Sequence, residues 1–183
     1  MDGLTLAVLA GGGWLLMKAH REATLRRLAF VDAVKAAFDI DNFPTGRAAE
    51  RLMWVSQWEP VIHELCHEAG YEDVRTSSGY RSQEFNDMLS QASPTSYHRH
   101  GLALDFGGLG LWSGPRNATR YLRENAGRLV VPPRTVIAED DHIHVDWFDP
   151  FNELPESRSN RNTLWLQERE SRAPGESKFT ALR

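Results

Sequence analysis

The sequence lacks the features that mark several specialised classes of protein. A single cysteine, Cys66, among 183 residues excludes an internal disulfide, although it leaves the cellular compartment open. The formal net charge of -4 gives no excess of basic side chains, so a nucleic-acid partner is not expected. Internal repeats are also lacking. The composition, 41% hydrophobic and 25% charged residues, is typical of a soluble globular protein with one domain and a real core.

The N-terminus lacks a hydrophobic run of full membrane-spanning length. The uncharged stretch from Gly3 to Met17 is shorter than the roughly 20 residues that cross a bilayer as a helix. Three glycines at 11–13 weaken it as an isolated helix. Only Asp2 carries a charge before the run, whereas a signal peptide begins with basic residues. We therefore expect residues 1–21 to form a hydrophobic docking helix or a membrane anchor, with a signal peptide as the remaining alternative.

The rest of the chain mixes short helices with short strands. Residues 22–55 predict helices with a turn-rich break at 39–46, and another helix is expected over about 57–70. Shorter helices are expected at 82–91 and at 113–127, where Ser113 could be the N-cap. Strands are expected within 72–82 and 100–108, and two more within 128–149 around a Pro-Pro turn.

This mixture predicts an α+β fold rather than a doubly wound parallel sheet. The sequence divides into the hydrophobic segment 1–21, a helical lead-in over 22–55 and a main domain over 56–150. Residues 151–183 are polar and have little apolar periodicity, so they are expected to form an extended tail.

Residues 63–73, HELCHEAGYED, contain the pattern H-E-x-x-H, which on a helix places two histidines on zinc with a glutamate as general base. Asp73 stands where a third ligand is found in longer versions of this pattern. The same residues also predict an ordinary amphipathic helix, because Ile62, Leu65 and Cys66 share an apolar face opposite the histidines. Both interpretations are open on this stretch alone.

A second group of metal-binding residues lies further along the chain. Residues 96–105 have the pattern S-x-H-x-x-G-x-A-x-D, with His98 at its third position and Asp105 at its last. About 40 residues later, His142 and His144 stand two apart on an expected strand, so both would project from one face. Two histidines and one carboxylate, with a fourth position left for water, are a common set of ligands for catalytic zinc.

Three motifs in this order, S-G-Y-R-S at 78–82, S-x-H-x-x-G-x-A-x-D-F at 96–106 and D-H-I-H-V at 141–145, resemble the zinc D-alanyl-D-alanine carboxypeptidases and related peptidoglycan endopeptidases. The resemblance covers roughly residues 57–147. It implies a small, mostly antiparallel sheet flanked by helices, as in these peptidases and the Hedgehog domain. The helix before S-G-Y-R-S carries no ligands in this family, which favours the amphipathic interpretation of HELCH.

The resemblance also implies a role for each matching residue. His98, Asp105 and His144 would bind Zn²⁺. Asp141, three residues before His144, would be the catalytic base, and Arg81 would contact the substrate carbonyl or carboxylate. His142 would orient the base or hydrogen-bond the intermediate. Such a site combines a Lewis acid, a general base and a fixed guanidinium, which suits amide hydrolysis.

Some alternatives remain open. His100 lies two residues from His98 and could be the ligand in its place. Asp105 could cap a strand turn. Arg81 could form a structural ion pair with Glu139, Asp140 or Asp141.

We expect a zinc peptidase that cleaves an amide bond in the stem peptides of bacterial peptidoglycan, as a carboxypeptidase or an endopeptidase. The short chain suits a bacteriophage lysin or a virion-associated enzyme as well as a bacterial one. It would act in the periplasm or cell wall, with residues 3–17 docking into a membrane or virion shell. The alternative is a zinc-containing binding or structural protein of the same fold that does not catalyse.

Overall fold

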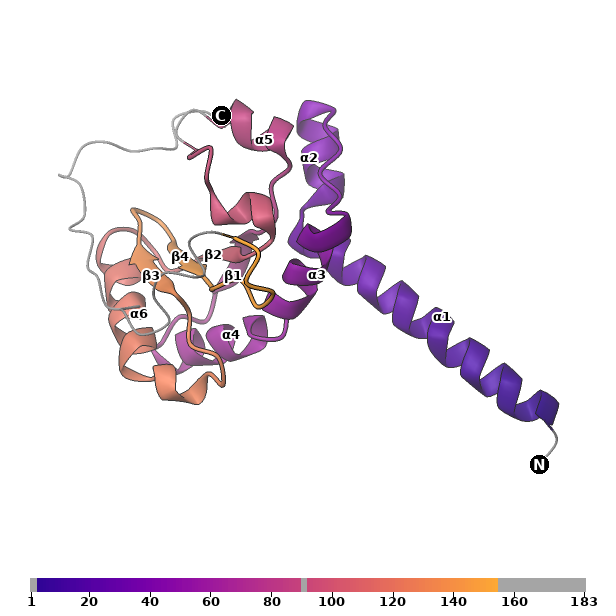
Figure 1. The fold of residues 1–183 in the computed structure, drawn as a ribbon. Coiled ribbons are helices and arrows are strands. Elements are labelled where there is room, and N and C mark those ends of the chain that lie inside the picture. Colours follow the sequence, from indigo (N-terminus) through magenta and orange to yellow (C-terminus); the bar gives the residue numbers. More distant parts are fainter. Residues whose placement is uncertain (1–2, 90–91, 155–183) are drawn as a thin grey trace.

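The computed structural model describes residues 3–89 and 92–154, with side chains described from residue 16 onward. Its centre is a four-stranded sheet in the order β1-β2-β4-β3, and every neighbouring pair is antiparallel. Figure 1 shows this sheet with short helices packed around it. The combination confirms the predicted α+β class. The strands are β1 Arg75–Ser78, β2 Ala103–Gly107, β3 Thr135–Ala138 and β4 Ile143–Asp146.

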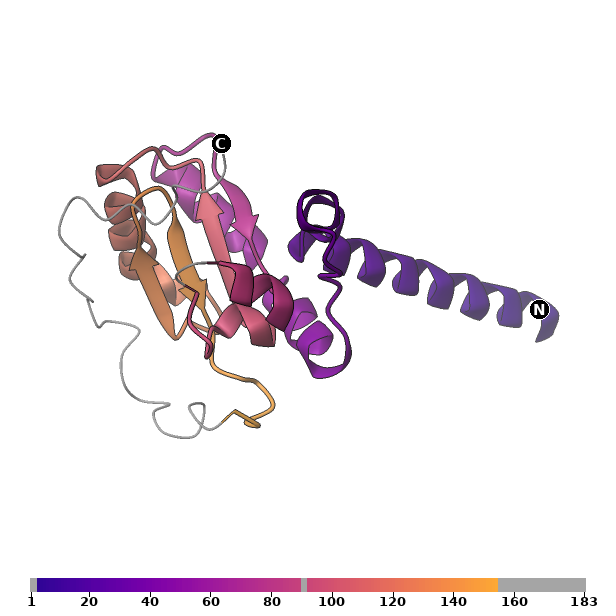
Figure 2. The ribbon, with the colours of Figure 1, turned by 90° about the horizontal axis from the view of Figure 1, so that it is seen from above.

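The helices surround the sheet and extend from it at the N-terminus. In Figures 1 and 2, α1 projects from the body as one long helix, so that its N-terminal end lies far from the sheet. No helix among the described residues is both long and apolar enough to span a membrane. The helices are α1 Gly3–Leu28, α2 Val31–Phe38, α3 Gly46–Val55, α4 Glu59–Glu68, α5 Gln83–Met88 and α6 Ser113–Glu124, with short 3-10 turns η1 Tyr97–His100 and η2 Ala126–Arg128.

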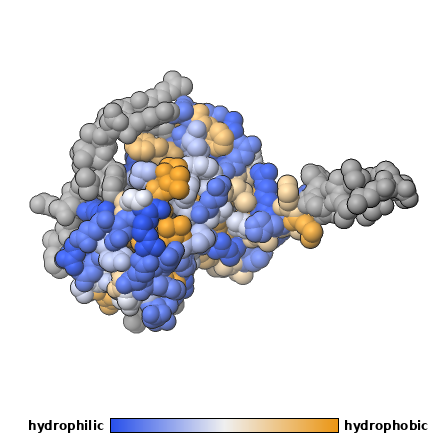
Figure 3. All heavy atoms as spheres, turned by 90° about the horizontal axis from the view of Figure 1, so that it is seen from below, coloured by the Kyte–Doolittle hydropathy of each residue, from blue (hydrophilic) through white to orange (hydrophobic). Residues whose placement is uncertain are grey.

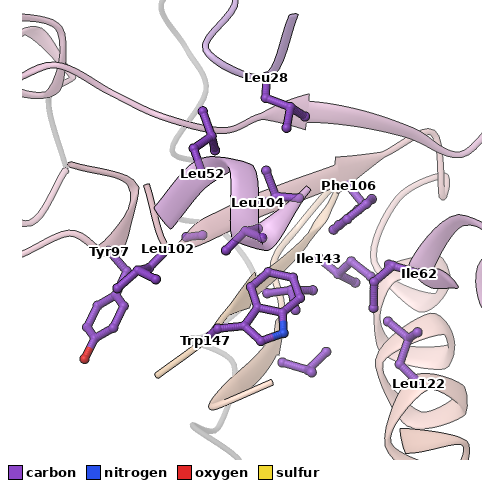
Figure 4. Packing of buried hydrophobic residues seen from close by; sticks show 14 of the residues in the cluster. Leu28, Leu52, Ile62, Tyr97, Leu102, Leu104, Phe106, Leu122, Ile143 and Trp147 are labelled. Atoms are coloured by element: carbon purple, nitrogen blue, oxygen red, sulfur yellow. The ribbon is translucent and has the colours of Figure 1, made fainter. Parts of the chain in front are cut away.

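Side-chain alternation separates the two faces of the sheet. In the register of β2 and β4, Phe106 lies opposite Ile143, whereas Asp105 lies opposite His144. Phe106 and Ile143 are fully buried and face α4 and α6, where Ile62 and Leu122 pack near them (Figure 4). Because successive side chains point to opposite faces, Asp105 and His144 must share the other face.

The core continues into the helices that precede the sheet. Leu28 at the end of α1 and Leu52 in α3 are completely buried and belong to the same hydrophobic cluster as the strands (Figure 4). The segment predicted as a helical lead-in therefore packs into one body with the sheet. On the outside, the face in Figure 3 is mostly hydrophilic, with hydrophobic side chains gathered in small patches.

Backbone and polar contacts attach α1 to this body. The guanidinium of Arg27 donates two hydrogen bonds of 2.6 Å to the carboxylate of Glu59, at the start of α4. Leu28 also packs against Gly79 so closely that a β-carbon on Gly79 would lie 2.0 Å from the Leu28 carbonyl oxygen. Only glycine fits at position 79 without a backbone shift.

Two local predictions were wrong, and the expected tail lies largely outside the described residues. The last two strands are joined by a turn at Asp140 and Asp141, not at the Pro-Pro pair, because the prolines come before β3. Trp112, not Ser113, occupies the N-cap position of α6. Of the tail predicted at 151–183, only residues 151–154 are described.

Candidate metal centre

Three side chains from different parts of the chain converge on the face of the sheet away from α4 and α6. Nε2 of His98 lies 3.1 Å from Oδ1 of Asp105 and 3.2 Å from Nδ1 of His144. Nδ1 of His144 lies 2.9 Å from the same Asp105 oxygen. These residues are the one group of three or more metal-ligating side chains found together in the described residues.

The sheet and one tight turn bring these residues together. Asp105 and His144 are direct partners across β2 and β4. His98 arrives from η1, which ends at Gly101 with a φ of +72°. A β-carbon on Gly101 would lie 2.4 Å from the Ala48 carbonyl oxygen, so glycine is needed both for the left-handed turn and for the close contact with α3. The chain then enters β2 at Ala103.

The outer nitrogen of each imidazole has its own acceptor. Nδ1 of His98 lies 2.6 Å from the carbonyl oxygen of Gly79, which can only accept, so Nδ1 carries a proton. Nε2 of His144 lies 3.3 Å from the carboxylate of Asp146 and donates to it. When neutral, each ring therefore turns a lone pair toward Oδ1 of Asp105. In that neutral form, three electron-pair donors meet with no hydrogen between them.

A metal ion fits this arrangement. Three atoms about 2.0–2.1 Å from one tetrahedral ion lie about 3.3 Å apart, close to the separations of 2.9–3.2 Å here. The set also has the outer hydrogen bonds that usually orient metal-binding histidines. His98, Asp105 and His144 are thus able to hold a metal ion, in agreement with the ligand set predicted from the sequence.

Burial and charge affect the three residues differently. Complete burial lowers the pKa of His98 to about 4, so its imidazole is neutral near pH 7. Burial also opposes charge on His144, but hydrogen bonds to Asp105 and Asp146 outweigh it and raise the pKa of His144 to about 10. Asp105 is buried as well, yet the two histidines hold its pKa well below the usual range. In the absence of a metal ion, a proton on His144 therefore balances the Asp105 carboxylate.

Arg81 belongs to the same cluster. Its Nη2 donates to Oδ2 of Asp105 at 2.7 Å, and Nε and Nη2 also contact the Ser78 hydroxyl at 3.1 and 2.9 Å. Asp105 thus presents one oxygen to the histidines and the other to Arg81. This contact replaces the alternative ion pairs with Glu139, Asp140 or Asp141. The S-G-Y-R-S motif supplies both this guanidinium and the Gly79 carbonyl that orients His98.

The turn between β3 and β4 carries the predicted base beside the centre. The amide of Glu139 donates to the carbonyl of His142 at 2.9 Å, which leaves Asp140 and Asp141 as a two-residue turn. Oδ1 of Asp141 lies 2.7 Å from Nδ1 of His142, while its side chain stays 48% exposed. Asp141 is therefore in the turn entering the strand, where strand alternation does not apply.

His142 lies between this turn and the group formed by His98, Asp105 and His144. Its Nε2 is 4.0 Å from Oδ2 of Asp105 and 3.8 Å from Oε2 of Glu139. Asp141 therefore orients His142 from one side of the ring, and the other side faces the cluster. His144, not His142, shares the ligand group with His98.

The HELCH residues take no part in the described cluster. His63 lies against the ring of Phe106 and contacts the Thr76 hydroxyl at 3.1 Å, so it is half-buried rather than fully solvated. His67 is exposed. Glu64 and Glu68 both pair with Arg128. The helix packs its apolar side into the core. The residues of the H-E-x-x-H pattern make structural contacts or lie at the surface, and none belongs to the candidate metal group.

Sequence reasoning missed the residues behind the ligands. Asp146, which accepts from His144, is itself bound by two hydrogen bonds from Arg134, at 2.7 and 2.8 Å. Its position two residues after His144 on a strand was the one available signal. The alternative ligand His100 ends η1 and is not among the grouped side chains.

Comparisons with protein-family models, with curated proteins and with solved structures find no match to this chain. The function of the protein must therefore be inferred from the residues of this site and from the motifs that they form.

Proposed function

We propose that this protein is a zinc-dependent peptidase that hydrolyses an amide bond in the stem peptides of bacterial peptidoglycan. One observation carries the proposal. The candidate ligand atoms of His98, Asp105 and His144 lie within 3.2 Å of one another, beside the Arg81 guanidinium and the turn that carries the Asp141 carboxylate. The motif resemblance favours peptidoglycan as the substrate and a fold like that of the zinc D-alanyl-D-alanine peptidases and the Hedgehog domain.

Zinc suits this ligand set better than a hard cation does. Magnesium and calcium prefer a shell of oxygens, whereas two imidazoles with one carboxylate are a frequent combination for catalytic zinc. When bound, zinc would polarise the scissile carbonyl and acidify the attacking water.

The remaining steps belong to the side chains around the centre. Asp141 uses Oδ1 to hold His142, and Oδ2, which takes no part in the described contacts of Asp141, would accept a proton from the attacking water. After the water oxygen bonds to the carbonyl carbon, the carbon–nitrogen bond breaks and Asp141 returns the proton to the leaving amine. Among the described contacts of Arg81, Nε and Nη2 are used and Nη1 is not, so Nη1 can donate to the developing oxyanion.

The test is hydrolysis of purified peptidoglycan with product analysis by mass spectrometry. Release of D-alanine would identify a carboxypeptidase, and shortened cross-links or stems would identify an endopeptidase. Activity should disappear with a chelator and return with zinc. Tight zinc binding without turnover on any stem peptide would instead favour a zinc-containing binding or structural protein.

We also propose that the N-terminal segment brings this domain to its site of action. Residues 3–17 are uncharged and lie on α1, which projects from the body in Figure 1. A membrane or a virion shell would cover such a helix, and the enzyme would then act in the periplasm or cell wall, as a bacterial enzyme or a bacteriophage lysin. Co-sedimentation with vesicles or with particles, with and without residues 1–21, tests the attachment.

A further inference from the structure

A buried ion pair lies directly behind one of the candidate metal ligands. Asp146 is 2% exposed, and Arg134 donates to both of its carboxylate oxygens, at 2.7 and 2.8 Å. The oxygen that accepts from Nη2 of Arg134 also faces Nε2 of His144 at 3.3 Å. The three side chains form a chain of contacts from the edge of the body to the centre.

The sheet makes room for this carboxylate. Asp146 lies opposite Ala103 of β2 and Thr135 of β3, on the same face as His144. Ala103 has the smallest side chain that still has a β-carbon, so the neighbouring strand leaves space for a polar group beside the ring. A buried carboxylate is costly unless it is paired and hydrogen-bonded, and Arg134 supplies that pairing.

We propose that Asp146, held by Arg134, is a positioning residue that fixes the ring of His144 for metal binding. An imidazole can rotate and can carry its proton on either nitrogen. The hydrogen bond from Nε2 to Asp146 selects the neutral form with its proton on Nε2 and the ring orientation in which Nδ1 faces Oδ1 of Asp105. The Gly79 carbonyl does the same for His98, through the opposite nitrogen. This inference rests on the proposed metal site.

Arg134 also connects the two histidine-bearing segments. Its guanidinium stacks on the ring of Tyr97, 3.8 Å from the ring centroid, and Tyr97 directly precedes His98. Its backbone amide donates to the Asp146 carbonyl at 2.7 Å. Arg134 therefore contacts β4 behind His144 and the turn that carries His98, so it aligns both rings.

The chain contains a matched control. Arg51 and Asp149 form another buried, two-pronged ion pair, with hydrogen bonds of 2.9 and 2.8 Å. Asp149 accepts in addition from the backbone amides of Phe151, Glu153 and Leu154, and none of these partners is a ligand imidazole. Asp149→Asn thus removes a comparable charge from a comparable pair without releasing His144.

The experiment compares the zinc affinity of the full-length wild type with that of Asp146→Asn, Arg134→Gln and Asp149→Asn, by competition with a chromophoric chelator. Circular dichroism sets a temperature at which each variant is folded. Asp146→Asn should weaken zinc binding about 10- to 100-fold, as expected for loss of an outer partner of a metal-binding histidine. Arg134→Gln should weaken it less, because Asp146 remains, and Asp149→Asn should leave it within about twofold of the wild type.

A spectroscopic measurement distinguishes a loss of His144 ring orientation from a general loss of structure around the site. In the zinc-loaded wild type, ¹⁵N NMR should assign the remaining proton of His144 to Nε2 and show slow exchange with solvent. In Asp146→Asn this exchange should become fast, while the signal of His98 keeps its Nδ1 proton. Equal loss of protection at both histidines would indicate a merely structural role and would overturn the proposal.

The outcomes also separate this inference from the metal site itself. Wild-type protein that binds no zinc overturns the proposed function and the inference together. Normal wild-type binding with unchanged affinity in Asp146→Asn overturns the inference alone. If Asp146→Asn does not fold, the test rests on Arg134→Gln. An unchanged zinc affinity in Arg134→Gln would then overturn the inference alone. A weakened zinc affinity in Arg134→Gln, with an unchanged affinity in Asp149→Asn, would support it.

Discussion

Arg81 and Asp105 are hydrogen-bonded across the candidate centre, with Nη2 of the guanidinium 2.7 Å from Oδ2 of the carboxylate. The other oxygen of Asp105 faces both histidines. One carboxylate thus connects the group that would hold the metal ion to the group that would contact the substrate. Asp105 would therefore position both the Arg81 guanidinium and the metal ion.

We expect Arg81→Gln to retain zinc and fold but to lose about 10²- to 10³-fold in kcat/KM, as is usual when one donor to an oxyanion is removed. Arg81→Lys should keep the charge and still lose most of the activity, because an ammonium cannot reproduce the planar fork that contacts Ser78 and Asp105. Steady-state kinetics with measured zinc content checks this. A fully active Arg81→Gln would show that the contact with Asp105 is only structural.

The two sets of histidines predict opposite results for metal content. His98→Ala or His144→Ala should abolish stoichiometric zinc binding, because each removes one of three protein ligands. His63→Ala and His67→Ala should leave zinc content unchanged. His63→Ala should nevertheless lower stability by about 1 kcal/mol, since it loses the contacts with Thr76 and Phe106. Loss of zinc from the His63 and His67 variants, with retention in His98→Ala, would reverse the assignment of the site.

For the base, Asp141→Asn should keep zinc and fold but lose about 10²- to 10⁴-fold in rate. The amide is nearly isosteric with the carboxylate but cannot accept a proton from water. Glu139→Gln and Asp140→Asn, in the same acidic turn, are the controls and should cost much less. Rates of the three variants, measured side by side, decide between them. An inactive Glu139→Gln with an active Asp141→Asn would move the role of base to Glu139, which lies 3.8 Å from His142.

Zinc binding should release about one proton at pH 7. Because the pKa of His144 is about 10 without a metal ion, its Nδ1 is protonated at neutral pH and must lose that proton to bind. His98, with a pKa of about 4, is already neutral. Affinity should therefore rise about tenfold per pH unit between roughly pH 5 and 9 and fall more steeply below about pH 4. Calorimetry in buffers of different ionisation enthalpy measures the released proton, and a pH-independent affinity would contradict the expectation.

Two N-terminal deletions should behave differently. Removing residues 1–21 should leave hydrolysis of soluble stem peptides near the wild-type rate, because every motif lies beyond residue 76. Removing residues 1–28 also deletes Leu25 and Leu28 from the core, where each buried leucine contributes about 2–5 kcal/mol, and breaks the Arg27–Glu59 pair. Thermal unfolding and activity of both proteins check this. A folded but inactive 22–183 protein would show that residues 1–21 belong to the catalytic machinery.

The resemblance of three motifs predicted the ligand group, and the structure brings His98, Asp105 and His144 together as a group that could hold a metal ion. The spacing from His98 to Asp105 needs only one tight turn at Gly101, and strand alternation sets the face on which His144 projects. Strand pairing was not deducible in this way. The register that places Asp105 opposite His144, and Ala103 opposite Asp146, depends on contacts between strands about 40 residues apart. The partner of Arg81 was left among three acidic residues, and the observed partner, Asp105, was not one of them.

The bulky aromatic residues show the same limit. Trp147 and Phe106 are completely buried, whereas Trp112 is 44% exposed beside the turn between β3 and β4, where its amide donates to the Asp140 carbonyl. The sequence does not distinguish a tryptophan in the core from an exposed one. The distinction depends on the path that the chain takes after β2.

The close approach of Leu28 to Gly79 joins the N-terminal helix to the metal centre through backbone alone. Gly79 receives the end of α1 on one side, and its carbonyl oxygen accepts from His98 on the other, at 2.6 Å. No flexible side chain lies between them to absorb a displacement. A load applied along α1, wherever its far end is held, is therefore transmitted to the imidazole of His98, one of the three candidate metal ligands. Tension on the N-terminal helix should change how tightly the protein retains its metal.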